Sequence, residues 1–229
     1  MKTLSPDRFF RSGIRIALPI LSALTLAAPA LEAGTWSAAK WTGDQYLPKA
    51  APDSVTHAVV FGIETEPAPP PPFEITKRIA GDNWSVWTYP EHAASVEVTR
   101  RPEKLLDSVK MEGSSAALLQ GRIVPKGKNK GLSLELTGLQ PGKNYNLVLF
   151  GPQILIPDST PGGKKITATA SDTPDKPEVL TVTGDSGKYF VYAYTAPDDG
   201  QLKIDLENAN TEHEIGIARL CAFMNYSVP

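Results

Sequence analysis

The sequence is poor in the residues that build disulfide-bonded, zinc-binding and nucleic-acid-binding proteins. Its 229 residues include one cysteine and three histidines, and 23 Lys and Arg against 25 Asp and Glu give a net charge of −2. Cys221 has no partner for an intramolecular disulfide, so we expect it to act as a small core side chain. His57, His92 and His213 stand at no metal-ligand spacing, which excludes a structural zinc site. Because the basic residues are scattered, we expect no nucleic-acid partner.

Long apolar runs are also rare, and the one that occurs lies near the N-terminus. Residues 16–30 carry no charge, but this run is shorter than the roughly 20 residues that cross a bilayer, so we expect no membrane span. Basic residues precede the run, and small residues follow it at Ala30 and Ala33. The pattern predicts a signal peptide over residues 1–33, cleaved after Ala33 or, alternatively, after Ala30. We therefore expect an exported protein, either periplasmic or extracellular and cell-surface.

Proline and glycine are abundant, whereas a long helical period is missing. The chain holds 21 prolines and 18 glycines, which shorten secondary structure and multiply turns. The stretch 64–72 is rich in proline and is expected to form an exposed polyproline II loop, with a spacer as the alternative. The segment between the cleavage site and this loop is too small to fold alone. We expect it to add an edge or N-terminal strand to a single domain over residues 34–229.

Short runs of β-branched and aromatic residues between turn signals predict an all-β protein. Leu132, Leu134 and Leu136 alternate with polar residues, as in a strand with one buried face. The segment 102–120 lacks this alternation and is expected to hold a short helical insertion. About ten or eleven strands are expected: 55–62, 73–79, 85–89, 95–99, 132–137, 145–150, 164–170, 177–183, 188–195, 202–207 and 214–223. This number favours an antiparallel, jelly-roll-like β-sandwich.

A Pro-Gly turn that leads into a strand starting with tyrosine is the most specific motif. Pro141 and Gly142 form the turn, and Tyr145 opens the strand, within the segment 139–150. The motif resembles the tyrosine corner of fibronectin type III-like sandwiches, in which the hydroxyl bonds to backbone a few residues upstream. The segments 41–44 and 56–62 are similar to those of galactose-binding and carbohydrate-binding modules of bacterial surface proteins. These resemblances imply a secreted β-sandwich module, but no particular activity.

No catalytic motif stands out in the sequence. The tripeptide at 184–186, Gly-Asp-Ser, also carries the nucleophile of one esterase superfamily, but its strand-rich surroundings favour a hairpin turn, and no Gly-x-Ser-x-Gly elbow occurs. We therefore expect a non-catalytic protein without a cofactor, with a hydrolase of unknown substrate as the third alternative. A structural calcium ion is the alternative to a protein without a cofactor, because sandwich loops bind calcium through carboxylates. The candidate ligands are Asp44, Asp82, Asp198, Asp199 and Asp205.

Aromatic side chains are the strongest indication of a ligand site. In a strand, Trp84 and Trp87 point to opposite faces, and Tyr89 shares the face of Trp87. A ring on the outside could stack on the apolar face of a sugar, whereas a ring on the inside would fill the core. The same two alternatives, stacking on a sugar or filling the core, apply to Trp41 and Trp36.

Two functions follow from these features. The first is an exported, non-catalytic sandwich that binds glycan or another surface polymer through Trp84, Trp87, Tyr89 or Trp41. The second is a structural subunit of a cell-surface or extracellular assembly, which would self-associate through unpaired edge strands. An exposed aromatic ring beside a polar cleft would favour the first. We expect the chain from Gly34 onward to be monomeric or weakly associated.

Overall fold

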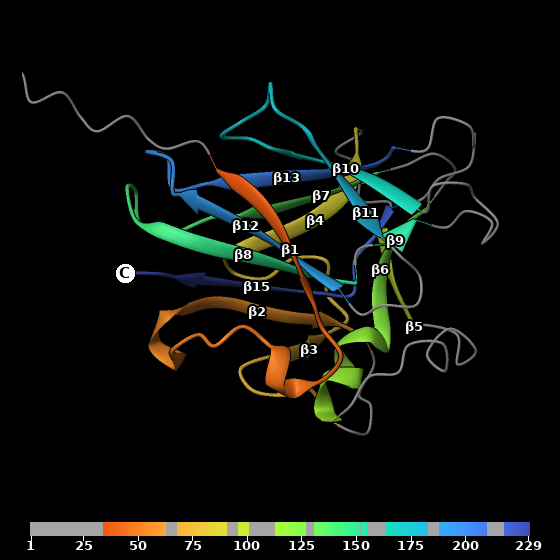
Figure 1. Ribbon diagram of the computed structural model, residues 1–229. Helices are drawn as coiled ribbons and strands as arrows, with labels where there is room; N and C mark the ends of the chain where they lie inside the picture. Colours follow the sequence, from red (N-terminus) through yellow and green to blue (C-terminus); the bar gives the residue numbers. More distant parts are fainter. Residues whose placement is uncertain are drawn as a thin grey trace, which may run out of the picture. The chain divides into compact units, whose positions relative to one another are not determined.

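A computed structural model describes residues 34–62, 68–90, 96–100, 113–126, 131–151, 153–154, 164–182, 188–209 and 218–229 (Figure 1). Strands dominate these ranges and form two main sheets, which confirms the predicted all-β sandwich. The predicted signal peptide (1–33), residues 64–67 of the proline-rich loop and residues 102–112 of the helical insertion lie outside them. In the described part of the chain, no helix is long and apolar enough to span a membrane.

The larger sheet has six strands, and its edges are β1 and β3. All its neighbouring pairs are antiparallel except β2 and β3, which run parallel with Val59 opposite Glu74. In spatial order the strands are β1 (Thr35–Lys40), β12 (Lys188–Thr195), β8 (Asn144–Phe150), β15 (Ala222–Ser227), β2 (Val55–Phe61) and β3 (Glu74–Thr76).

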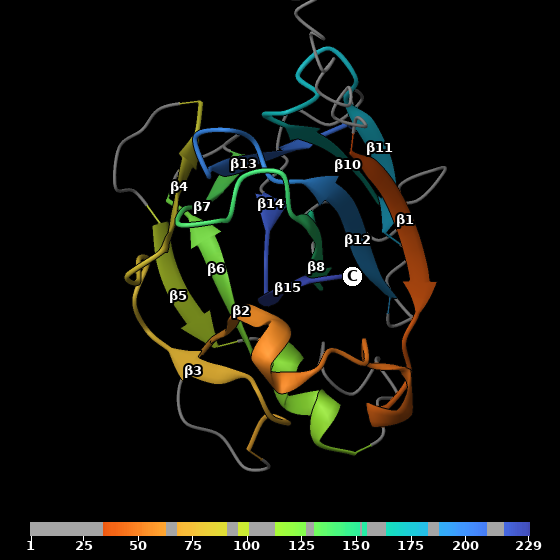
Figure 2. The same ribbon diagram turned by 90° about the vertical axis from the view of Figure 1, so that its left-hand side faces the viewer.

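The smaller sheet has five antiparallel strands, and its edges are β11 and β4. In spatial order they are β11 (Glu178–Val182), β10 (Lys164–Ala170), β13 (Leu202–Asn208), β7 (Gly131–Leu136) and β4 (Trp84–Tyr89). Two further pairs are β5 (Val96–Arg100) with β6 (Gly121–Pro125) and β9 (Gln153–Ile154) with β14 (Ala218–Arg219). Seen after a 90° turn, β1 and β11 lie at one side of the sandwich and β4 at the other (Figure 2).

The main core fills the space between the two sheets. The predicted inward face of β7 is present, since Leu132, Leu134 and Leu136 are all buried in this core. The opposite face was expected to be exposed, but Ser133 is buried there and Glu135 is half-buried. A second apolar cluster lies on the other face of the six-stranded sheet, where Val148 and Phe150 point away from the first. Cys221 is buried in this second cluster, in line with its expected role as a small core side chain.

The described residues also form three short 3₁₀ helices, the last of which contributes to the second cluster. They are η1 (Asp44–Tyr46), η2 (Pro52–Ser54) and η3 (Gly113–Leu119). Leu118 and Leu119 of η3 are buried in it. The described part of the predicted helical insertion is therefore a 3₁₀ helix that covers one sheet face.

The tyrosine corner joins the two sheets. The Tyr145 hydroxyl accepts a hydrogen bond of 3.1 Å from the backbone N–H of Gln140, in the connection from β7 to β8. The ring is buried and stacks on Tyr194, with centroids 5.7 Å apart. Gly142 has a φ of 73°, a left-handed conformation that costs little without a Cβ. The chain passes here from the five-stranded to the six-stranded sheet, as the motif predicts.

Two of the predicted strands differ in extent. The strand expected over 73–79 is limited to β3, because the chain leaves the sheet after Thr76. The strand expected over 214–223 is divided, with β14 and β15 on either side of Leu220 and Cys221. The expected N-terminal edge strand is present as β1.

Candidate functional site

A groove opens where the β3 edge of one sheet meets the β4 edge of the other. It consists of two adjoining hollows, of about 620 Å³ and about 360 Å³. Four residues line both hollows: Val59, Glu74, Asp82 and Trp84. Each hollow falls within or near the size range of small-ligand sites, roughly 300–1,000 Å³. We take this groove as the candidate site.

The segment 77–83, which connects β3 to β4, forms one wall of the groove. Backbone hydrogen bonds fix it at several points: Gly81 N donates to Trp84 O at 2.8 Å, and Val86 N donates to Ile79 O at 2.8 Å. Thr137 N of the neighbouring turn donates to Asn83 O at 2.9 Å. The wall is thus held in place before any ligand arrives, which lowers the entropy cost of binding.

Trp84 lines both hollows and packs its ring against the core. Its indole lies edge-on against Phe61 and Phe223, with centroids 5.9 Å and 5.6 Å away. The side chain is half-buried. A Cβ placed on Gly81 would lie only 2.2 Å from the indole nitrogen, so glycine is required for this close approach. Of the four aromatic residues predicted for ligand binding, Trp84 is the one that lines the groove.

Charged side chains of both signs line the larger hollow. Glu74 and Asp82 supply carboxylates, Lys77 and Arg78 supply cations, and all four are exposed. Carboxylates accept hydrogen bonds, and ammonium and guanidinium groups donate them. The sequence did not single out Glu74, Lys77 or Arg78. They come together because β3 pairs in parallel with β2, which the proline-rich sequence before β3 does not reveal.

A β-bulge in β2 supports the wall from below. Asn225 of β15 faces His57 and Tyr226 faces Val55, which leaves Thr56 as the extra residue. His57 Nε2–H donates to the backbone oxygen of Asn83 at 3.0 Å, and Nδ1 lies 2.9 Å from Thr56 Oγ1. Bulges of this kind redirect side chains at functional sites.

His57 is buried and neutral beneath the smaller hollow, which it helps to line. Burial lowers its pKa, and the hydrogen bond to Asn83 opposes that effect only in part. Asn225 Nδ2 donates to Thr56 Oγ1 at 2.8 Å, and Tyr194 Oη donates to Asn225 Oδ1 at 3.0 Å. The network therefore connects the centre of the sandwich to the groove wall, and His57 is a positioning residue rather than a metal ligand.

Trp87 and Tyr89 lie on the outer face of the five-stranded sheet, away from Trp84, as strand alternation predicts. Trp87 is only 8% exposed, so its expected use as an open aromatic platform is wrong. Tyr89 is half-buried, and Lys203 Nζ lies 5.6 Å from its ring centroid. Neither residue lines the groove.

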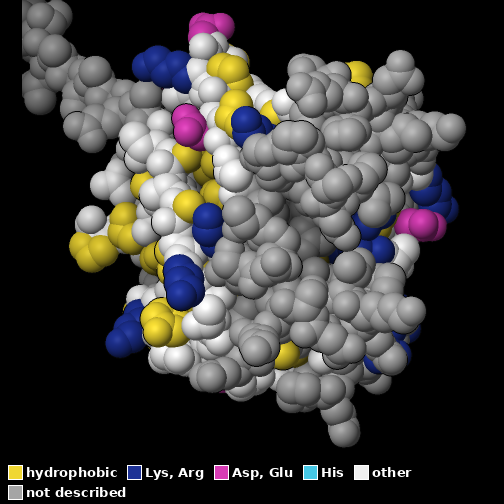
Figure 3. All heavy atoms as spheres, turned by 45° about the vertical axis from the view of Figure 1, so that its right-hand side comes forward, with side chains coloured by type: hydrophobic (Ala, Val, Ile, Leu, Met, Phe, Trp, Pro, Cys, Tyr) yellow, Lys and Arg dark blue, Asp and Glu magenta, His cyan; other side chains and the backbone are white. Residues whose placement is uncertain are grey.

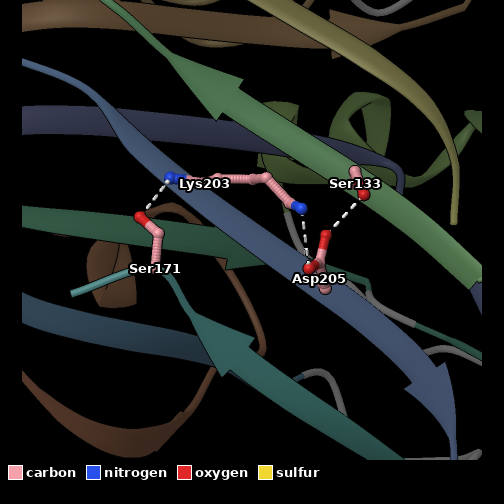
Figure 4. A network of polar contacts seen from close by, with 4 residues as sticks. All are labelled: Ser133, Ser171, Lys203 and Asp205. Carbon is pink, nitrogen blue, oxygen red and sulfur yellow. Dashed lines mark hydrogen bonds and ion pairs between the residues drawn. The ribbon is translucent and has the colours of Figure 1, made fainter. Parts of the chain in front are cut away.

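The same outer face carries a polar network (Figure 4). Ser133 donates to Asp205, and Lys203 Nζ lies 3.1 Å from the other oxygen of that carboxylate. Lys203 N donates to Ser171 Oγ at 3.0 Å. Ser133 and Lys203 therefore fix the orientation of the Asp205 carboxylate on this face of the sheet. No metal ion is needed to explain that orientation.

Trp41, the fourth predicted ligand residue, is fully buried. Its ring lies edge-on against Phe150, with centroids 5.1 Å apart, in the second apolar cluster. A ring with no exposed surface cannot stack on a sugar, so this expectation is corrected. Trp36 of β1 is half-buried, and its ring packs against that of Tyr192 with centroids 4.7 Å apart.

Asp44 caps η3 instead of presenting free oxygens. Its carboxylate accepts hydrogen bonds from Ser114 N at 3.0 Å and Ser115 N at 2.6 Å, and from both hydroxyls. Burial would raise the pKa of this carboxyl, but the hydrogen bonds from Ser115 and Ser114 together lower it. The Asp44 carboxylate therefore has a structural role as the cap of η3.

The remaining calcium candidates do not gather in one place. Among the residues that the structure describes, no three His, Cys, Asp or Glu side chains could hold one ion together. Asp198 and Asp199 lie in the turn between β12 and β13, where Asp199 accepts from Gln201 N at 3.0 Å. Calcium binding at this turn stays a prediction.

On the face drawn in Figure 3, the coloured Lys and Arg side chains are interspersed with acidic and hydrophobic ones. Clustered basic residues are the electrostatic feature of nucleic-acid binding. The part of this face that the structure describes has no such cluster.

Comparisons with known proteins show no family model and no curated protein that matches the chain. Several solved structures match part of the chain at low sequence identity. The extracellular domain of ANXUR2 from Arabidopsis thaliana is 10% identical, with a TM-score of 0.43 over 63% of this chain and 41% of that one.

Two carbohydrate-binding modules are among these neighbours. TmCBM61, in complex with β-1,4-galactotriose, is 13% identical with a TM-score of 0.33 over 63% of this chain and 88% of that one. The CBM22-1 and GH10 modules of Clostridium thermocellum xylanase 10B, complexed with xylohexaose, are 13% identical with a TM-score of 0.36. That match covers 65% of this chain and 26% of the xylanase, so the chain spans less than half of the two larger proteins. At these identities, no functional residue is carried over.

Proposed function

We propose that the protein is an exported, non-catalytic β-sandwich that binds a glycan in the groove between β3 and β4. The observation that carries this proposal is the position of Trp84, a residue that lines both hollows beside Glu74 and Asp82 and whose ring packs against Phe223. An apolar ring beside convergent hydrogen-bonding groups is the general composition of a small-molecule site.

The chemistry of the groove suits a saccharide. A sugar ring has an apolar C–H face, which packs on an indole, and hydroxyl groups around its rim. Glu74 and Asp82 would accept hydrogen bonds from these hydroxyls, and Lys77 and Arg78 would donate to the ring and glycosidic oxygens. Two carboxylates are balanced by two cations, so the groove favours an uncharged glycan over a strongly acidic or basic polymer.

Binding to a panel of soluble oligosaccharides, measured by isothermal titration calorimetry, tests the proposal. Asp82→Asn should weaken binding about tenfold, equivalent to about 1.4 kcal/mol, because a charged acceptor is lost. Asp199→Asn is the matched control, since it removes a carboxylate that is also exposed but lies in the turn between β12 and β13, away from the groove. The proposal fails if the panel and a set of insoluble polysaccharides give no binding, or if both variants bind equally.

The proposal states binding without turnover. Incubation of the protein with the glycan that it retains should release no shortened products. Release of such products would instead support the hydrolase alternative. A structural role in a cell-surface assembly is the second candidate function, and the open edge of β1 favours it.

A further inference from the structure

The β1 edge of the six-stranded sheet is open to another strand. In the described part of the chain, β1 pairs only with β12, and none of its backbone groups bonds elsewhere. Its residues from Thr35 to Ala39 are uncharged and contain no proline, and Ser37 and Ala38 at its centre are exposed. Edge strands usually carry charges, proline or bulges that prevent pairing with another chain. The first five residues of β1 carry none of these.

The other three edges of the two main sheets are less open to a second strand. β3 is only three residues long and lies between a proline run and the charged pair Lys77 and Arg78. The edge of β4 (Trp84–Tyr89) is partly occupied by the chain itself, because Gly81 N donates a hydrogen bond to Trp84 O and Val86 N donates one to Ile79 O. β11 is preceded by Pro177 and begins with Glu178. Proline donates no ladder hydrogen bond, and charges oppose edge-to-edge association. β1 is therefore the edge that suits a second strand best.

We propose that β1 pairs antiparallel with β1 of a second copy of this chain, which joins the two six-stranded sheets into one. In an antiparallel pair related by a twofold axis perpendicular to the sheet, opposed residues share a face, so their numbers have the same parity. The register centred on Ala38 places Ala38 opposite Ala38 of the second copy. It also places Lys40 opposite Trp36 of the second copy, which allows a cation–π contact.

This dimer would leave both grooves accessible. The groove lies at the β3 and β4 edges, on the opposite side of the sandwich from β1 (Figure 2). Two grooves on one rigid body would engage one polymer at two points, which raises the apparent affinity without any new contact. This consequence rests on the proposed function, whereas the dimer itself does not.

Analytical ultracentrifugation of the purified protein without saccharide tests the dimer. The average mass should rise with concentration toward twice the monomer mass. Ala38→Glu should keep the protein monomeric, because two like charges would face each other in the pair. Val179→Glu on β11 is the matched control, since Val179 is also apolar and 51% exposed on an edge strand; this variant should dimerise as the original chain does.

A charge exchange makes the test specific to the proposed register. Ala38→Lys alone should also stay monomeric, whereas an equimolar mixture of Ala38→Glu and Ala38→Lys should dimerise again. Circular dichroism should show the same strand content for all variants. The proposal is overturned if the original chain stays monomeric at every concentration, if Ala38→Glu still dimerises, if Val179→Glu prevents association, or if the mixture stays monomeric. No glycan is present, so failure here is distinct from failure of the proposed function.

Discussion

The Trp84 indole lies edge-on against the Phe223 ring, with centroids 5.6 Å apart and an interplanar angle of 70°. Trp84 belongs to β4 and Phe223 to β15, so the contact joins the two sheets of the sandwich. Trp84 also lines both hollows of the groove. One side chain therefore serves packing and, in the proposed function, ligand binding.

Trp84→Ala should lower the free energy of unfolding by about 3 kcal/mol, because it removes the ring that packs against both Phe61 and Phe223. Trp84→Phe should lose less, since it keeps part of the apolar volume. Urea denaturation of the three proteins measures both changes. An Ala variant as stable as the original chain would show that the ring does not contribute to the core.

Tyr145→Phe should lower the free energy of unfolding by about 0.5–1.5 kcal/mol, because it removes the hydroxyl that accepts from Gln140 N. The ring remains, so the stack on Tyr194 is kept. Tyr46→Phe is the control, since Tyr46 is 49% exposed. Equal denaturation midpoints for the two variants would show that the corner bond contributes no stability.

Stability should fall between neutral and mildly acidic pH because of His57. Its pKa is lowered in the folded protein, mainly by burial, so the unfolded chain binds the proton more readily. The contribution of His57 is complete above the unfolded pKa of about 6.5 and is lost as pH falls from there toward the folded pKa. His57→Gln should lose less stability than the original chain between pH 7.5 and 5.5, as measured by urea denaturation. An equal loss in both proteins would contradict this prediction.

Ala38→Glu should bind a short oligosaccharide as the original chain does, because residue 38 lies on β1, away from the groove. Its retention on an insoluble polysaccharide should fall at least tenfold, since a monomer engages one site at a time. Calorimetry and a pull-down measure the two quantities on the same protein. A parallel loss in both would instead indicate that the substitution disturbs the groove.

The sequence was informative wherever local pattern determines structure. Leu132, Leu134 and Leu136 alternate with polar residues because their face of β7 points into the main core, and the Pro-Gly turn before Tyr145 fixes a local hydrogen bond. Both features depend on residues close together in the chain, so the sandwich and its corner could be predicted.

The site depends on contacts between distant segments, which the sequence does not specify. Glu74 reaches the groove through a parallel pairing with Val59, and His57 reaches Asn83 through a bulge opposite Asn225. Strand alternation correctly placed Trp84 and Trp87 on opposite faces of β4. Alternation does not show, however, whether the outer face of the sheet is exposed at a given residue. Trp87 is therefore buried although it lies on the outer face.

The indole N–H resonances of the four tryptophans offer the most direct test of the central claim. In a ¹H–¹⁵N correlation spectrum, the missing peak of Trp84→Phe identifies the Trp84 resonance. Titration with a bound oligosaccharide should shift this peak and leave that of the fully buried Trp41 in place. A shift confined to Trp87, on the outer face of the five-stranded sheet, with the Trp84 peak unchanged would contradict glycan binding in the groove.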